Sequence, residues 1–465
     1  MNLFDTIAAI STPYGKGGVA MIRISGAEAV SVASRVFVTA SGKSLCDTEH
    51  AKAVYGEIFM PDGKARGENS IDDGIAVVFR APHSFTGEDT VEITCHGGIL
   101  VTQKVLSAVL CAGARAAEAG EFTRRAYVSG KMKLTEAEAL GNLLESRSES
   151  QLLLARSGMR GKLSARMEAL YNSLRDVLSG IYAVIDFPDE DLSEMSREEM
   201  ETEISGVLDG IRHLCNTYGT GRAVTEGIST VICGRTNAGK SSVYNRLLGY
   251  DAAIVTDIEG TTRDVLRENV SVGKVMLSLC DTAGLRSTDD KVESIGIERS
   301  LKEMDNAELI LAVFDGSSLP TDDDRELVQR IKATGKSAIA LINKSDLSCG
   351  REFFDLCKGF ARAVSVSAES GDGFDELTSA IEELFIDGEI DMANDAVVTG
   401  ARQYAALNSS AELLEKAVGD MKNGVSLDAC CVGVECAMSA LGEVDGREIG
   451  EEIVAQIFSR FCVGK

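Results

Sequence analysis

The chain has 465 residues, 44% of them apolar and 26% charged, a composition that excludes disordered, collagen-like and fibrous proteins. At roughly 150 residues per domain, this length predicts about three domains. The 47 basic and 72 acidic side chains give a formal charge of −25, which argues against nucleic-acid binding through a general basic field; any such contact needs a local patch or a basic partner.

The N-terminus and the cysteines favour a cytoplasmic location. Asp5 stands where a signal peptide would carry positive charge, and no apolar run approaches the ~18 residues of a membrane span. Twelve scattered cysteines without C-x-x-C spacing are typical of reduced thiols. The four histidines are too dispersed to suggest a zinc site.

Residues 1–130 predict a compact α+β domain. Residues 19–24 and 75–79 are β-branched runs expected to form strands, and a helix is expected over 99–111. From 131 to 218, leucines at helical spacing predict the first half of a helical domain.

Two capping boxes are expected in this helical region, because each pairs a hydroxyl with an acid three residues later and so satisfies two backbone N–H groups. One is Thr135 with Glu138, and the other is Ser196 with Glu199. The acidic segment 186–191 interrupts the helices between them.

Residues 219–386 alternate strand and helix signals. This pattern predicts a mostly parallel sheet with helices on both faces, the buried strands being expected at 228–233, 277–280, 309–314 and 338–342. Apolar faces over 401–421 and 446–461 predict that residues 387–465 form the second half of the helical domain. The α/β domain is then an insertion between two helical halves.

Residues 234–241 match G-x-x-x-x-G-K-[ST], between an expected strand and a helix expected over 242–248. Glycines let backbone N–H groups surround phosphates, Lys240 reaches the β/γ oxygens, and Ser241 ligates Mg²⁺. A chance glycine turn is the alternative, and the strand–loop–helix order disfavours it. The nucleotide-binding positions expected here are Asn237, Ala238, Gly239, Lys240, Ser241 and Ser242.

Two further tetrapeptides follow buried strands, and in this order they indicate a GTPase. In the first (Asp281, Thr282, Ala283, Gly284), the Asp281 carboxylate can hold the Mg²⁺ shell and the Gly284 N–H can sense a γ-phosphate. In the second (Asn343, Lys344, Ser345, Asp346), a carboxylate can pair with the N1–H and amine of guanine; adenine would leave polar groups unpaired. Ser367 and Ala368 can supply the contact to guanine O6.

The loop between the first two motifs can complete the Mg²⁺ shell through Thr262, with an ordinary hairpin loop as the alternative. Its expected nucleotide-binding residues are Thr256, Asp257, Ile258, Glu259, Gly260, Thr261 and Thr262. Arg286 stands where a Ras-like enzyme carries a water-orienting glutamine, so water must be positioned in another way. The candidates are Arg286, Arg263, Glu293 or a bound cation; a solvated surface charge is the alternative for Glu293.

Together with the flanking helices and the terminal FCVGK, these motifs resemble the MnmE/TrmE family of tRNA uridine-34 modification GTPases. The resemblance covers essentially the whole chain, and the terminal C-x-G-K and the G-T-T-R-D loop are its most specific parts. In the N-terminal domain it is carried by residues 5–9, 17–26, 84–89, 96–98 and 120–126.

The resemblance implies that the N-terminal domain binds a formyl-tetrahydrofolate one-carbon donor and forms a homodimer. The family's folate-contacting positions fall on Arg23, Glu92, Lys131 and Lys465, each of which, taken alone, could be a surface charge. Cys462 beside them is either a small buried apolar residue or a nucleophile.

The resemblance also implies that K⁺ replaces an arginine finger. Its ligands would be Asn237, Thr256, the carbonyl of Ile258, and Thr261. Glu293 falls on the water-orienting position, so Glu293 and Lys240 are the expected catalytic residues. Thr236 stands where the family often has proline, which should alter loop stiffness more than chemistry.

The function implied is a K⁺-stimulated GTPase that works with the flavoprotein MnmG, as a heterotetramer, on the wobble uridine of certain tRNAs. It adds a carboxymethylaminomethyl group at C5, and GTP hydrolysis drives G-domain dimerisation. A ribosome-assembly GTPase would need a basic KH-like GXXG segment, which we do not find. A dynamin-like scaffold would need a membrane-binding face, which the −25 charge disfavours.

Overall fold

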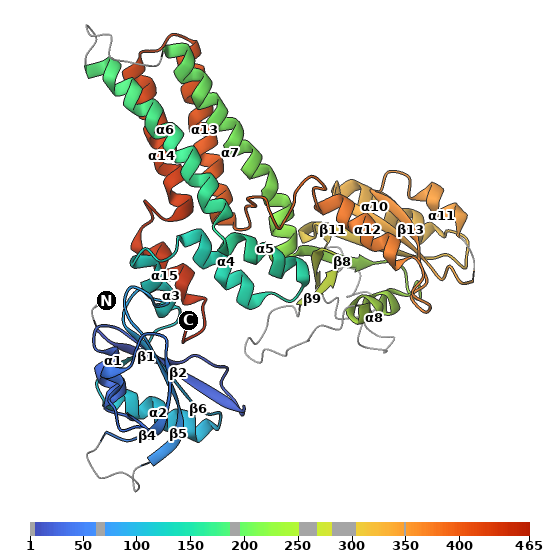
Figure 1. The fold of residues 1–465 in the computed structure, drawn as a ribbon. Helices are drawn as coiled ribbons and strands as arrows, with labels where there is room; N and C mark the ends of the chain where they lie inside the picture. The colour runs from blue at the N-terminus through green and yellow to red at the C-terminus, as the bar shows by residue number, and fades with distance from the viewer. Residues whose placement is uncertain (1–4, 62–69, 187–195, 251–266, 281–303, 348–349) are drawn as a thin grey trace. The chain divides into compact units, whose positions relative to one another are not determined.

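The computed structural model describes residues 5–61, 70–186, 196–250, 267–280, 304–347 and 350–465 (Figure 1). Contacts divide the chain into two compact units, one of Met1–Gly141 with Asp445–Lys465 and the other of Asn142–Val444. The expected multidomain architecture of α/β and helical parts is confirmed.

The first unit is built on a seven-stranded sheet in the order β3-β4-β5-β6-β2-β1-β7, with every neighbouring pair antiparallel except β1 and β7. Both predicted strands and the predicted helix are present, in β2, β5 and α2. The strands are β1 (Ile7–Ile10), β2 (Val19–Ser25), β3 (Phe37–Thr39), β4 (Ala53–Phe59), β5 (Ser70–Phe79), β6 (Thr90–His96) and β7 (Arg115–Ala116). The helices of this part are α1 (Ala29–Ser34), the short 3-10 helix η1 (Leu45–Asp47) and α2 (Ile99–Cys111).

The two faces of this sheet have different coverings. Alternate side chains of β2, β5 and β6 pack with α1 and α2 in one core. On the other face Ile7 and Ala9 of β1 pack with Phe122 of α3 (Glu121–Val128). The alternation follows from the two-residue period of a strand, which sends successive side chains to opposite faces.

The end of the chain belongs to the same unit. Val454 and Phe458 of α15 (Glu451–Ser459) pack with Leu134 and Ala137 of α4 (Leu134–Glu145). By their contacts, residues 445–465 belong with the N-terminal domain, whereas the sequence pattern predicts that they belong with the preceding helices.

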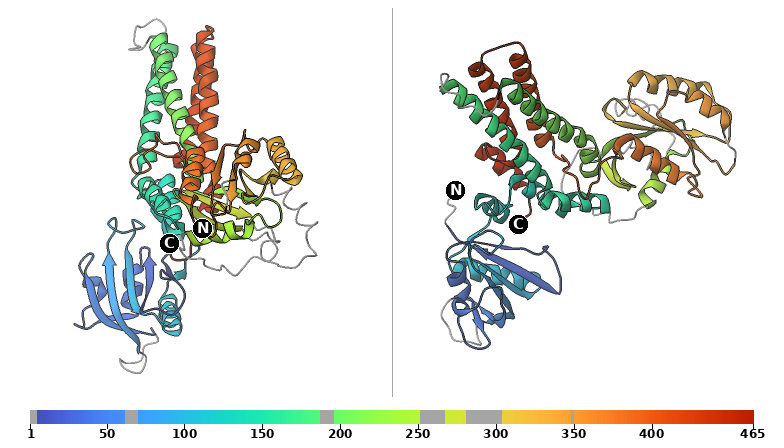
Figure 2. Two further views of the ribbon diagram at one scale, coloured as in Figure 1. Left: turned by 90° about the vertical axis from the view of Figure 1, so that its right-hand side faces the viewer. Right: turned by 45° about the horizontal axis from the view of Figure 1, so that its top comes forward.

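The second unit contains a helical bundle whose members come from both sides of the α/β insertion. Its long helices run side by side in every view (Figures 1 and 2) and share one core, which confirms the inserted arrangement. The bundle is made of α6 (Lys162–Asp186), α7 (Arg197–Thr225), α13 (Ala401–Lys422) and α14 (Leu427–Asp445), preceded by α5 (Glu149–Met159).

Helix starts and ends test the capping predictions. The box of Ser196 and Glu199 is confirmed at the start of α7. The box assigned to Thr135 is wrong, because α4 begins at Leu134 and the Glu136 carboxylate accepts the Lys133 N–H at 3.0 Å. The helix expected over 446–461 is also shorter, since α15 begins only at Glu451, and α14 was not predicted as a separate element.

The inserted domain has a six-stranded sheet in the order β13-β12-β11-β8-β10-β9, parallel except for β9 with β10. Helices α8 and α12 cover one face and α10 and α11 the other, as predicted. The strands are β8 (Ile228–Cys233), β9 (Arg267–Val272), β10 (Val275–Cys280), β11 (Leu309–Asp315), β12 (Ser337–Asn343) and β13 (Arg362–Ser365). The helices are α8 (Lys240–Tyr250), α10 (Asp322–Thr334), α11 (Arg351–Leu356) and α12 (Phe374–Phe385).

Among the described helices of both units, none combines the length and the apolar character that crossing a membrane requires.

Candidate functional site

The loop of residues 234–239, the predicted phosphate loop, joins β8 to α8 and passes very close to two other strands. A Cβ on Gly234 would lie 2.2 Å from the Val313 carbonyl oxygen, and one on Gly239 would lie 2.1 Å from Nδ2 of Asn343. Gly239 also has φ +97°, a conformation that costs L residues energy. Only glycine therefore fits at these two positions, and the loop packs tightly on the sheet as it enters the N-terminus of α8, the end of a helix that favours anions.

Lys240 is the first residue of α8, and its ammonium lies over the loop. Its Nζ donates to the carbonyl oxygens of Gly234 at 3.0 Å and of Arg235 at 2.9 Å. Asn237, at the tip, has a left-handed φ of 62° and is exposed. The charge, the backbone N–H groups and the helix N-terminus converge where the sequence predicts the phosphates of a nucleotide.

Asn343, at the end of β12, connects the predicted phosphate loop to residues 367–368 of the predicted guanine-binding segment. It is 3% exposed, its Nδ2 donates to the Ala238 carbonyl at 3.0 Å, and its Oδ1 accepts the Ala368 N–H at 3.0 Å. Asp346 Oδ1 accepts the Ser367 hydroxyl at 2.8 Å. Five predicted nucleotide-binding residues are thus brought together.

Asp315, the last residue of β11, also belongs to this arrangement, although no motif in the sequence points to it. It stands opposite Asn343 in the parallel ladder and accepts Lys344 Nζ at 2.7 Å and the Ser317 hydroxyl at 2.5 Å. Partial burial raises the pKa of Asp315, but the hydrogen bonds from Lys344 and Ser317 outweigh it and hold that pKa below its ordinary value. The available signal was a carboxylate at the carboxyl end of a buried parallel strand, the edge where α/β sheets bind ligands.

Several predicted positions lie outside the described residues. They are Thr256, Asp257, Ile258, Glu259, Gly260, Thr261, Thr262, Arg263, Asp281, Thr282, Ala283, Gly284, Arg286 and Glu293.

A second polar site lies on the N-terminal sheet. Arg23 of β2 stands directly opposite Glu92 of β6, and its Nε donates to the carboxylate at 2.9 Å. The guanidinium carbon also lies 5.4 Å from the ring centre of Phe85 and 5.7 Å from that of Phe122. A cation, a carboxylate and two aromatic rings suit a flat heterocycle that carries an amide-like edge and an anionic tail.

The other predicted members of this site lie on neighbouring segments. Lys131 is exposed and donates to the Pro82 carbonyl at 3.1 Å. The chain end is held by the Ser11 hydroxyl, which donates to the Gly464 carbonyl at 3.0 Å, so Lys465 is anchored at the end of β1. Cys462 is exposed, which contradicts the interpretation of a small buried apolar residue.

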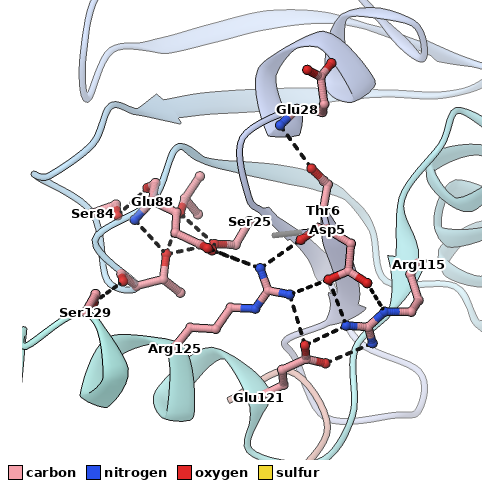
Figure 3. A network of polar contacts seen from close by, with 12 residues as sticks. Asp5, Thr6, Ser25, Glu28, Ser84, Glu88, Arg115, Glu121, Arg125 and Ser129 are labelled. Carbon is pink, nitrogen blue, oxygen red and sulfur yellow. Dashed lines mark hydrogen bonds and ion pairs between the residues drawn. The ribbon is translucent and has the colours of Figure 1, made fainter. Parts of the chain in front are cut away.

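Beside this site, two arginines and three carboxylates form a network that the sequence did not reveal (Figure 3). Arg115 donates to Asp5 at 2.7 Å and to Glu121 at 2.7 Å. Arg125, whose side chain is 2% exposed, donates to Asp5 at 2.9 Å, to Glu121 at 3.0 Å and to Glu88 at 3.2 Å. Burial raises the pKa of Glu121, but hydrogen bonds from Arg115, the Glu118 N–H and Arg125 overcome it and lower that pKa.

This network predicts acid sensitivity of the N-terminal domain. A lowered folded-state pKa of Glu121 stabilises the fold above the ordinary glutamate value of about 4.3, and that contribution is lost as the pH falls below it. Glu121→Gln is expected to cost about 2 kcal/mol at neutral pH and to flatten the pH dependence, measured by hydrogen exchange of the α3 amides. Equal pH profiles for the variant and the parent would contradict this account.

Comparison with known proteins supports the sequence resemblance. Residues 6–131 match the family model described as the GTP-binding protein TrmE N-terminus, and residues 134–462 match the MnmE helical domain. The second match spans the inserted α/β domain, as an insertion between helical halves requires.

Two curated relatives illustrate the similarity. The tRNA modification GTPase MnmE of Symbiobacterium thermophilum is 40% identical over 99% of this chain and 99% of its own length. The protein of the same name from Ligilactobacillus salivarius is 38% identical over 99% of this chain and 98% of its own length. Among solved structures, an Aquifex aeolicus Era variant bound to GDP.AlF4- has 24% sequence identity to this chain. The match covers 40% of this chain and 66% of that chain, with a TM-score of 0.27. The two family models and the full-length identity show that the chain belongs to the MnmE family.

Proposed function

We propose that the protein is a GTP hydrolase that acts in tRNA modification, as the names of its relatives state for them. The observation that carries this proposal is the double hydrogen bond of Asn343, which joins the phosphate loop to the predicted guanine-binding segment in a chain similar to MnmE proteins over its full length. The Asn343 side chain holds the predicted phosphate loop and the predicted guanine-binding segment next to each other. This arrangement suits a single nucleotide that contacts both.

We further propose that the protein, through the regions outside the inserted α/β domain of residues 219–386 (the G domain), takes part in placing a carboxymethylaminomethyl group at C5 of uridine 34 in certain tRNAs. The protein would act in the cytoplasm as a homodimer, bound to the flavoprotein MnmG. This partner would supply most of the tRNA-binding surface, since this chain carries a formal charge of −25. GTP hydrolysis would bring G domains together and rearrange the assembly.

For the metals, the chemistry of the proposed donor set supports the fit, because hydroxyl, side-chain amide and carbonyl oxygens are the ligands that hard cations such as Mg²⁺ prefer. Ser241, with Thr262, would hold Mg²⁺. The K⁺ ligands would be Asn237, Thr256, the Ile258 carbonyl and Thr261. Bound there, the two cations would offset negative charge at the β/γ oxygens, while Lys240 holds those oxygens and Glu293 orients the attacking water.

For the folate, the donor set on the N-terminal sheet supports the fit. The Glu92 carboxylate can accept from the N–H edge of a pterin, and Arg23, Lys131 and Lys465 can hold an anionic tail. The rings of Phe85 and Phe122 add apolar surface beside the Arg23 guanidinium. A formyl-tetrahydrofolate would supply the one-carbon unit, and the exposed Cys462 thiol remains a candidate nucleophile.

The experiment that tests this function is nucleoside analysis of tRNA from cells lacking the protein, with the parent gene and an Asp346→Asn gene returned separately. Loss of the wobble-uridine adduct and its recovery only with the parent gene would support the proposal. Intact adduct together with defective ribosomal particles would favour a ribosome-assembly GTPase.

The proposed K⁺ site predicts a cation preference. In Na⁺, GTP turnover is expected to fall at least about tenfold relative to K⁺, because a charge beside the β/γ bridge is then less well placed. Asn237→Ala should lower turnover in K⁺ and reduce the difference between the two salts. Asn245→Ala, an exposed asparagine of α8, is the matched control and should keep the parent preference. Equal rates of the parent protein in both salts would refute the K⁺ assignment.

A further inference from the structure

The loop of residues 84–89 lies between two of the proposed folate-contacting positions. Phe85 of this loop lies over the Arg23 guanidinium, 5.4 Å from ring centre to cation. A Cβ at Gly87 of the same loop would come within 3.2 Å of Lys131 Cγ, and Lys131 Nζ donates to the Pro82 carbonyl just before the loop. The loop and the residues just before it therefore contact both Arg23 and Lys131.

Glu88 anchors the loop from within. Both oxygens of its carboxylate lie 3.2 Å from Nη1 of Arg125, and one of them accepts the Ser25 hydroxyl at 2.9 Å. Ser25 ends β2, the strand that carries Arg23. The Ser129 hydroxyl, just after α3, donates to the Thr86 carbonyl at 2.6 Å. Glu88 thus joins the strand of Arg23 to the helix that precedes Lys131.

Arg125 ties this loop to two other segments (Figure 3). The same Nη1 donates to the Asp5 carbonyl at 2.8 Å, while Nη2 donates to the carboxylates of Asp5 and Glu121. Lysine could not replace it, because one ammonium on a flexible stem lacks the planar fork that reaches several acceptors at once.

We propose that Arg125 is a positioning residue for the folate site, acting through Glu88 on the loop 84–89 and so on the spacing of Arg23, Phe85 and Lys131. The inference rests on the proposed folate-binding function of this domain. The competing explanation is a buried charge cluster that stabilises the domain and has no effect on the ligand.

The test measures the affinity of the full-length protein for 5-formyl-tetrahydrofolate by calorimetric titration, at a temperature well below unfolding. Glu88→Gln removes only the charged link to the loop and leaves Arg125 paired with Asp5 and Glu121, so the domain should fold. Glu88→Gln and Arg125→Lys are expected to weaken folate binding by about tenfold or more, with GTP turnover unchanged. Glu118→Gln, which changes an exposed carboxylate nearby, is the control and should bind like the parent.

The outcomes separate the two proposals. If the parent protein does not bind the folate, the proposed function of the domain is wrong. If the parent binds and Glu88→Gln binds equally well, even with a lower melting temperature, the network is structural and the positioning role is refuted. A direct check adds guanidinium chloride to the Arg125→Ala protein, which should restore its affinity for the folate. Methylammonium chloride at equal ionic strength should not restore it. If guanidinium does not restore the affinity either, the positioning role of the Arg125 guanidinium is refuted.

Discussion

Replacing Asp346 with asparagine is expected to change the base preference of the protein from guanine to xanthine. A carboxylate accepts from both N1–H and the 2-amino group of guanine, whereas an asparagine amide turns a donor toward that amine. Xanthine has a carbonyl oxygen at the same place and accepts from the amide. A base that does not match the side chain leaves desolvated polar groups unpaired. The ratio of the affinities for guanine and xanthine nucleotides should therefore change by about 10⁴-fold.

The structure makes this substitution informative, because the rest of the loop can keep its geometry. Asp346 uses Oδ1 to accept the Ser367 hydroxyl at 2.8 Å, a bond that the carbonyl oxygen of asparagine can retain. Competition between GDP and xanthosine diphosphate measures the preference. Glu369→Gln, an exposed change in the neighbouring loop, should leave it unaltered. If the Asp346→Asn protein still prefers guanine, Asp346 does not recognise the base.

The G-domain fold could be predicted because its signals are local. Residues 228–233 are apolar except for Ser229 and Thr230, and residues 309–314 and 338–342 are uninterrupted apolar runs. All three form buried strands with both faces covered, as parallel sheets require. The phosphate loop follows the first of them directly. Short-range pattern and long-range packing agree here, so the sequence alone places Gly239, Lys240 and Asn343 at one edge of the sheet.

The features that the sequence did not reveal depend on contacts between distant segments. Arg125 meets Asp5 and Glu88 across 120 and 37 residues of chain, and no local pattern marks these partners. Thr135 is not a capping residue for a different reason: Glu136 already accepts the Lys133 N–H, and the helix begins at Leu134, before Thr135. Helix α14 was missed as a separate element because its apolar face is built from cysteine, alanine and valine more than from leucine.

The second large effect is expected at Gly239. An alanine there would combine the strained φ of +97° with a Cβ placed 2.1 Å from Nδ2 of Asn343. Asn343 would have to move, and its bonds to the Ala238 carbonyl and the Ala368 N–H would lengthen together. The free variant can relieve this contact by moving Asn343, whereas bound GTP requires both loops in their native positions. Restoring those positions against the backbone strain and the close contact costs about 3 kcal/mol, so GTP affinity should fall by roughly a hundredfold.

Gly249→Ala is the matched control, because Gly249 lies in α8, nothing approaches its added Cβ within 4 Å, and its φ is not in the left-handed region. Alanine inside a helix should leave nucleotide affinity unchanged and stabilise the domain by about 0.5–1 kcal/mol. Calorimetric titration with GDP and with inorganic pyrophosphate separates the two halves of the site. If Gly239→Ala weakens pyrophosphate binding but keeps the preference for guanine, Asn343 does not couple the two loops. The double hydrogen bond of Asn343 would then no longer support the GTPase proposal.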